Sequence, residues 1–152
     1  MRIESFRDLL NWTSGYHRNL SHCLAHSAKK HSEERSKMLL DHLADKELQL
    51  SDIVGGFKDI AANNTLSTWC IEHLDQHPLL DNTLDDMAFA AMTNAEIITE
   101  VENLHQHLIL LYQNLLGRSH PPQMQQLLVE IHDVEKSEAQ QMMQGANRLE
   151  DL

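Results

Sequence analysis

Glycine, proline, cysteine and aromatic residues are all scarce in this chain of 152 residues, which contains 5 Gly, 3 Pro, 2 Cys and 5% aromatic side chains. The abundant Leu, Met, Ala, Gln and Glu favour helix over sheet. Cys23 and Cys70 form no Cys-x-x-Cys pattern, so we expect two reduced, packed thiols rather than a disulfide framework. One domain, covering residues 1–152, is the simplest organisation and is large enough to bury a sizeable core.

Long apolar runs and an excess of positive charge are also missing. The net charge of -11, with His neutral, disfavours a general nucleic-acid or anionic-membrane surface. No stretch approaches the roughly 20 apolar residues that a membrane span needs. The segment MRIESFRDLLNW contains acidic residues and no long apolar run, so it does not have the pattern of a signal peptide. We therefore expect a cytoplasmic protein without membrane or nucleic-acid partners, and a homo-oligomer, with a dimer favoured.

Four long helical patterns remain, at about residues 3–30, 32–61, 93–116 and 121–148. The first two are joined by a short link, so they should be antiparallel neighbours. Thr93 or Asn94 is the expected N-cap of the third helix, and Gly117 is its expected end.

Residues 62–92 have a different pattern, with Pro78 between short apolar clusters. They predict a long crossover with short helices at roughly 66–76 and 83–90. The fold prediction is therefore all-α, a four-helix bundle of two antiparallel hairpins joined by a long crossover.

Ionisable side chains interrupt the apolar stripe of each predicted helix near its middle: His17, Glu47, His105 and Glu135. Glu138 follows Glu135 by one helical turn. Helix midpoints in an antiparallel bundle lie at similar depth, so these five side chains should converge in one layer of the core. With 11 histidines in the chain, its charge and any metal affinity should depend on pH.

Such a layer is costly unless something compensates it, because an unpaired buried carboxylate costs several kcal/mol or becomes neutral. A cation resolves this by offsetting the carboxylates and binding neutral imidazole. Mixed Glu and His ligands without Cys suit iron or manganese, with zinc also acceptable. The alternative is a polar network without metal, in which a glutamate is protonated or reaches water.

The segments LADKELQL (43–50) and VEIHDVEKSEAQQMM (129–143) resemble the second and fourth helices of ferritin-like, particularly rubrerythrin-like, di-iron carboxylate proteins. That resemblance implies Glu-x-x-His on these two helices and a Glu on each of the others. Here Leu50 and Glu138 stand at the two His positions. His17 and His105 stand nearest the other two ligand positions, with Glu102 as an additional candidate ligand. The resemblance therefore implies a remodelled site for one or two metal ions, or a degenerate site that has lost its metal.

Two function hypotheses follow from these patterns. The first is a metal-binding ferritin-like protein, with an iron-dependent oxidation or peroxide-related reaction of unknown substrate, and with Tyr16 or Tyr112 close to the metal. The second is a non-enzymatic helical interaction module that has lost the metal site. No Gly-x-Ser-x-Gly or phosphate-binding glycine loop supports nucleophilic catalysis.

The remaining histidines have weaker patterns. Two pairs have the i, i+4 spacing of a helical zinc clamp, but they lack a completing ligand and are expected on the surface: His22 with His26, and His73 with His77. His42 and His132 lie beside the apolar stripes, where we expect them to flank the site.

Overall fold

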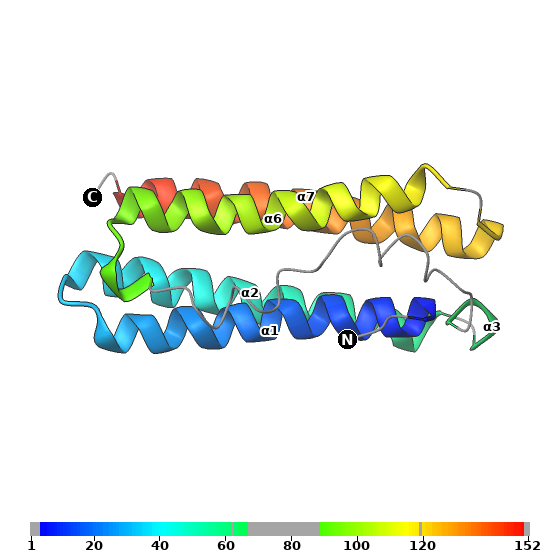
Figure 1. Cartoon of the computed structure of the whole chain (residues 1–152), viewed down its shortest axis with the longest axis horizontal. Coiled ribbons are helices and arrows are strands. Elements are labelled where there is room, and N and C mark those ends of the chain that lie inside the picture. Colours follow the sequence, from blue (N-terminus) through cyan, green and yellow to red (C-terminus); the bar gives the residue numbers. More distant parts are fainter. Residues whose placement is uncertain (1–3, 62, 67–88, 119, 151–152) are drawn as a thin grey trace.

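The computed structural model describes residues 4–61, 63–66, 89–118 and 120–150 of the chain (Figure 1). Every regular element in these ranges is helical and no β-strand occurs in them, so the all-α prediction is confirmed for this part of the chain. The elements are α1 (Phe6–Lys30), α2 (Glu34–Ile60), the short α3 (Asn63–Leu66), the 3-10 turn η1 (Phe89–Ala91), α6 (Asn94–Leu116) and α7 (Pro122–Glu150).

The four long helices lie side by side as two antiparallel pairs, α1 with α2 and α6 with α7 (Figure 1). The short α1–α2 link predicts this neighbouring arrangement, and the structure agrees. The bounds of the long helices differ from the predicted ones by only a few residues. Most of the expected crossover lies outside the described residues, including all but Leu66 of the first short helix predicted there and all but Phe89 and Ala90 of the second.

Local capping explains where two of these helices begin. The Ser5 hydroxyl accepts a hydrogen bond from the Asp8 amide at the start of α1. At the start of α6, the Thr93 hydroxyl accepts from the Glu96 amide while the Glu96 carboxylate accepts from the Thr93 amide. This reciprocal pair is a capping box. Thr93 is therefore the N-cap, and Gly117 is the C-cap of α6, as predicted.

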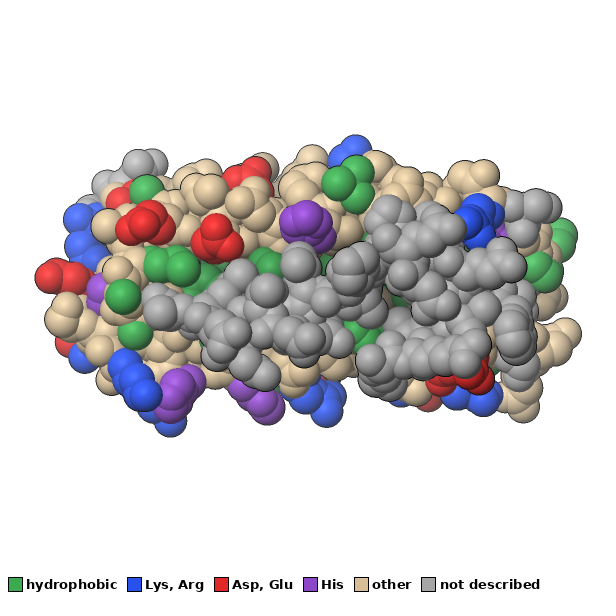
Figure 2. All heavy atoms as spheres, in the orientation of Figure 1, with side chains coloured by type: hydrophobic (Ala, Val, Ile, Leu, Met, Phe, Trp, Pro, Cys, Tyr) green, Lys and Arg blue, Asp and Glu red, His purple; other side chains and the backbone are tan. Residues whose placement is uncertain are grey.

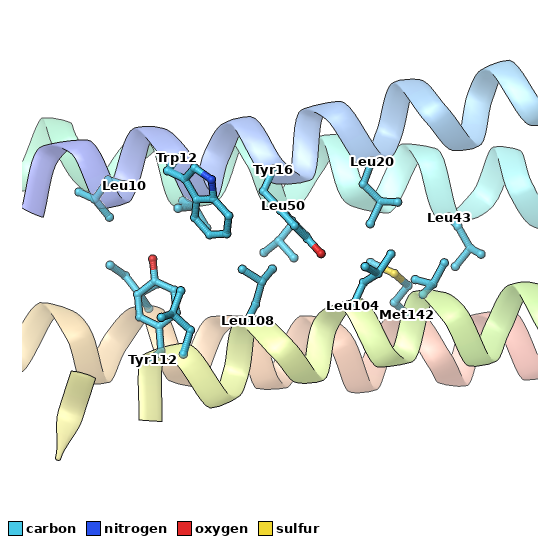
Figure 3. Packing of buried hydrophobic residues seen from close by; sticks show 14 of the residues in the cluster. Leu10, Trp12, Tyr16, Leu20, Leu43, Leu50, Leu104, Leu108, Tyr112 and Met142 are labelled. Atoms are coloured by element: carbon cyan, nitrogen blue, oxygen red, sulfur yellow. The ribbon is translucent and has the colours of Figure 1, made fainter. Parts of the chain in front are cut away.

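The hydrophobic core lies between the two helix pairs (Figure 3). Leu20 of α1, Leu43 of α2, Leu104 of α6 and Met142 of α7 are each at most 2% exposed. Burying a side chain of this size contributes about 1.5–3 kcal/mol relative to exposure. This apolar packing surrounds the middle of the molecule, so any ionisable group there lies far from water.

The surface carries charged side chains of both signs, and on the face seen in Figure 2 the basic side chains do not gather into one patch. Among the described residues, no helix combines the length and the apolar character that crossing a membrane would require.

A buried histidine and glutamate cluster as candidate metal centre

One ionisable side chain from each long helix meets at the middle of the core. His17 of α1, Glu47 of α2 and Glu135 of α7 are 0% exposed, and His105 of α6 is 1% exposed. Each stands three or four residues from an apolar residue of its helix. Steps of three and four residues return to one face of a helix, so each of the four lies on the apolar stripe. The structure thus brings together four of the five residues that the sequence places in one layer.

The four side chains form a continuous chain of contacts. His17 Nε2 lies 2.7 Å from Glu135 Oε1, and His17 Nδ1 lies 2.7 Å from Glu47 Oε2. The second oxygen of Glu47, Oε1, contacts Nε2 of His105. The two imidazole rings are tilted by 34° with their centroids 5.6 Å apart. Glu47 therefore bridges the two histidines, and His17 bridges the two glutamates.

The charges of this chain stabilise one another. Burial opposes a charge on His17, but the carboxylates of Glu135 and Glu47 outweigh it and raise the His17 pKa to about 10. Burial likewise favours a neutral Glu47, yet His105 and His17 lower the Glu47 pKa to about 2. Without a metal, the His17 ring is thus an imidazolium that donates hydrogen bonds to both carboxylates.

Two polar atoms of the cluster still lack a hydrogen-bond partner among the described residues, namely Glu135 Oε2 and His105 Nδ1. Both are buried, and an unsatisfied buried polar atom costs about 1–3 kcal/mol. The charges of the cluster are therefore paired, but two of its buried polar atoms remain without hydrogen bonds.

Three of the four residues have the geometry of a metal-binding group. Ligand atoms of His17, Glu47 and His105 all lie within 4.8 Å of one another. Metal–ligand bonds of about 2.0–2.2 Å place neighbouring ligand atoms roughly 3–4 Å apart, so the Glu47 oxygens and the ring nitrogens that they contact would separate slightly to admit a cation. Two imidazoles and one carboxylate are a donor set used for zinc and for non-haem iron.

The fourth residue, Glu135, contacts the opposite side of the His17 ring. A metal-binding histidine usually donates its other ring N–H to a carboxylate or carbonyl, which fixes the orientation of the ring. Because Glu135 holds Nε2 of His17, Nδ1 is the nitrogen left to bind a metal together with Glu47. The donor set and its supporting carboxylate both fit a metal ion.

Glu138 and Glu102 are not part of this cluster. Glu138 is half-buried and Glu102 is exposed, and no hydrogen bond or ion pair joins either of them to the four residues in the described part of the chain. At 3.6 residues per turn, Glu138 points about 60° to one side of Glu135 and Ala139 about 40° to the other. The structure buries Ala139, so the continuation of the stripe after Glu135 is Ala139 rather than Glu138.

Tyr16 lies against the cluster, and Tyr112 contacts a residue one helical turn away from it. The Tyr16 ring stands edge-on to His17, with centroids 6.0 Å apart. The Tyr112 hydroxyl lies 2.6 Å from Thr13 Oγ1, one helical turn before His17. Thr13 donates its own hydroxyl hydrogen to the Leu9 carbonyl, so Tyr112 is the donor to Thr13. Sequence reasoning missed this contact, although both residues stand on the apolar stripes of their helices.

The other predicted histidine positions are peripheral. His22 and His26 are exposed, as expected, and His73 and His77 lie outside the described residues. His42 and His132 are half-buried beside the stripes. Of the two cysteines, Cys23 is half-buried and Cys70 lies outside the described residues.

The fold and these contacts define a class: an all-helical protein with a histidine and carboxylate cluster at the centre of its core. Comparisons of the chain with protein-family models, with curated proteins and with solved structures find no match.

Proposed function

We propose that this chain is a metal-binding four-helix bundle of the ferritin-like kind, with one divalent cation bound by His17, Glu47 and His105. The observation that supports this proposal best is the meeting of three ligand atoms within 4.8 Å inside an apolar core. Iron or manganese is the proposed ion, and zinc suits the same donors.

Charge supports the proposal as well. Glu47 and Glu135 bring two carboxyl groups into a site that water does not reach. A divalent cation would offset their charge and displace the protons that His17 Nδ1 and His105 Nε2 share with Glu47. Metal binding should therefore release protons and weaken as the pH falls.

The residues of the chain would hold the ion in place and limit what reaches it. Glu135 orients His17, and the surrounding leucines exclude bulk water. Iron held by these three residues would supply oxidation or peroxide-related chemistry, which is the proposed activity. Burial of the cluster restricts that chemistry to very small reactants.

A second candidate function is a metal-free helical interaction module. It is favoured by the raised pKa of His17, about 10, because an imidazolium between two carboxylates compensates much of the buried charge without a metal. In this case the cluster is structural. The acidic surface, on a chain of net charge -11, would then serve protein contacts or self-association.

Metal analysis of protein purified without a histidine tag tests the proposal. We expect bound metal, and a rise in melting temperature when Fe(II), Mn(II) or Zn(II) is added to metal-free protein. At a ligand concentration of about 100 times Kd, the stabilisation is about 2.7 kcal/mol.

His105→Gln should abolish this stabilisation, whereas His26→Gln, at an exposed position, is the matched control and should leave it intact. Protein that carries no metal and whose melting temperature does not respond to any of the three ions would contradict the proposal and support the metal-free module.

A further inference from the structure

The outer side of α1 carries a line of basic side chains. Five exposed residues form this basic stripe: Arg7, Arg18, His22, His26 and Lys29. They share one side of the helix because their spacings are close to whole turns, and the buried residues of α1 lie on the opposite side. Blue and purple side chains follow one another along the lower edge of the molecule, where α1 runs (Figure 2).

The neighbouring helix α2 has the opposite charge on its outer side. Four exposed aspartates form an acidic stripe there: Asp41, Asp45, Asp52 and Asp59. Their spacings also return to one side of the helix, opposite its buried residues. Leu48, which is 43% exposed, stands between Asp45 and Asp52 on this side. The outer face of the α1–α2 pair is therefore basic along one helix and acidic along the other.

The charges of the two stripes are not used within one copy of the chain. In the described part of the molecule, no ion pair joins any side chain of either stripe to another residue. The chain as a whole has a net charge of -11, so a basic stripe on it attracts an acidic surface. The acidic stripe of a second copy is such a surface, and the attraction is mutual.

The packing of α1 against α2 determines which charges lie at the same height. The Ser14 hydroxyl donates a hydrogen bond to the Ser51 carbonyl, and the Ser21 hydroxyl donates to the Ala44 carbonyl. Each step forward along α1 therefore matches one step back along α2. Three basic positions are level with an aspartate to within two residues, or about 3 Å: Arg7 with Asp59, Arg18 with Asp45, and His26 with Asp41.

We propose that the outer face of the α1–α2 pair binds the same face of a second copy of this chain, with the basic stripe of each copy on the acidic stripe of the other. A twofold axis parallel to the helices produces this arrangement, because it places α1 over α2 and leaves heights unchanged. Residues that are level within one copy are then opposite each other across the interface. A twofold axis in the same face but perpendicular to the helices would instead place basic on basic.

The size of the face fits a dimer. The two helices contain 25 and 27 residues, so the face is about 38 Å long and about 20 Å wide. It would bury about 750 Å² per copy, close to the 800 Å² or so per partner of a standard interface. Exposed ion pairs are individually weak, so we expect a Kd on the order of micromolar, with Leu48 covered at the centre.

Sedimentation velocity of the full chain, at about 1–100 μM, tests the inference. We expect a dimer at about 0.1 M salt, and a Kd at least about tenfold higher at about 1 M salt. Between these concentrations the screening length falls from about 10 Å to about 3 Å, which weakens attraction between exposed charges. The expected dimer does not depend on the proposed metal.

Charge reversal identifies the face. Arg18→Glu and Asp45→Lys should each raise Kd at least about tenfold, because each variant places like charges together twice in a twofold dimer. The double variant should restore dimerisation, because the two reversed charges again oppose each other. Arg148→Glu and Glu130→Lys make the same changes in net charge at exposed positions of α7, and as matched controls they should change Kd less than about threefold.

Asp52→Lys tests the alignment. Asp52 is level with Thr13 and not with a basic residue, so this variant should weaken the dimer much less than Asp45→Lys. All substituted positions are exposed, so melting temperatures close to that of the natural protein should confirm that the variants fold.

Three results would overturn the proposal. They are a monomer over the whole concentration range at about 0.1 M salt, a dimer that neither single reversal weakens, and a double variant that does not recover dimerisation. A monomer would leave the two stripes to other partners of opposite charge.

Discussion

Glu47→Gln should be the most damaging single change in the cluster of metal-free protein. Glu47 is 0% exposed and its two oxygens contact two different histidines. A glutamine at this position offers one acceptor oxygen instead of two and carries no negative charge. His17, with its pKa raised to about 10, would also lose one of its two counter-charges.

The magnitude follows from removing one partner of a buried ion pair, which costs about 3–5 kcal/mol. For a chain of this size each kcal/mol lowers the melting temperature by about 2–4 °C, so a fall of roughly 6–20 °C is expected. Urea and thermal unfolding in the presence of a chelator measure both quantities without a contribution from metal.

Two matched glutamate variants test the reasoning. Glu135→Gln removes a residue that contacts one histidine of the cluster, where Glu47 contacts two, and should cost less than Glu47→Gln. Glu138→Gln, at a half-buried position outside the cluster, should change stability by less than about 1 kcal/mol. If the free energy of unfolding of Glu47→Gln lies within about 1 kcal/mol of that of the natural protein, the charge pairing described for Glu47 is wrong.

Two further predictions concern pH and glycine. The raised pKa of His17 stabilises metal-free protein fully below about pH 6.5, and this contribution is lost as the pH rises towards 10. The lowered pKa of Glu47 stabilises it above about pH 4.5, and this contribution is lost as the pH falls towards 2. The melting temperatures of the natural protein and of Glu47→Gln should approach each other at both ends of this pH range. A difference in melting temperature that stays constant with pH would refute this explanation. Gly56→Ala, inside α2 with open space around a new Cβ, should stabilise by about 0.5–1 kcal/mol. Gly145→Ala should increase stability by less, because its Cβ would lie 2.7 Å from His42 Nε2. Urea unfolding measures both variants, and an equal increase in stability would show that His42 moves without cost.

The sequence predicts much of the fold because the signals are local. Apolar residues at helical spacing identify the four long helices, and Thr93 and Gly117 mark the ends of α6. The same spacing places His17 and Glu47 on buried stripes, where the structure finds them. These predictions need no knowledge of how one helix packs against another.

The contacts within the cluster depend on how the helices pack against one another, so the sequence pattern could not predict them. Steps of three and of four residues are both helical, so periodicity alone cannot choose between Glu138 and Ala139 as the residue after Glu135. Packing at the α7 face decides in favour of the smaller Ala139. Likewise, the pairing of each His17 nitrogen with a different glutamate depends on the rotation of α2 and α7 about their axes.

The single cluster residue from each long helix also determines how the helices are aligned along their length. Leucine stripes tolerate sliding, because one leucine can replace another in a similar hole. A slip of one turn would carry a side chain about 5.4 Å along the axis and separate Glu47 from both histidines. The cluster thus favours one alignment of the four helices over alignments shifted by a turn, as a buried polar residue specifies the register of a coiled coil. A chain whose central layer were entirely leucine would pack as tightly but would lack this distinction between registers.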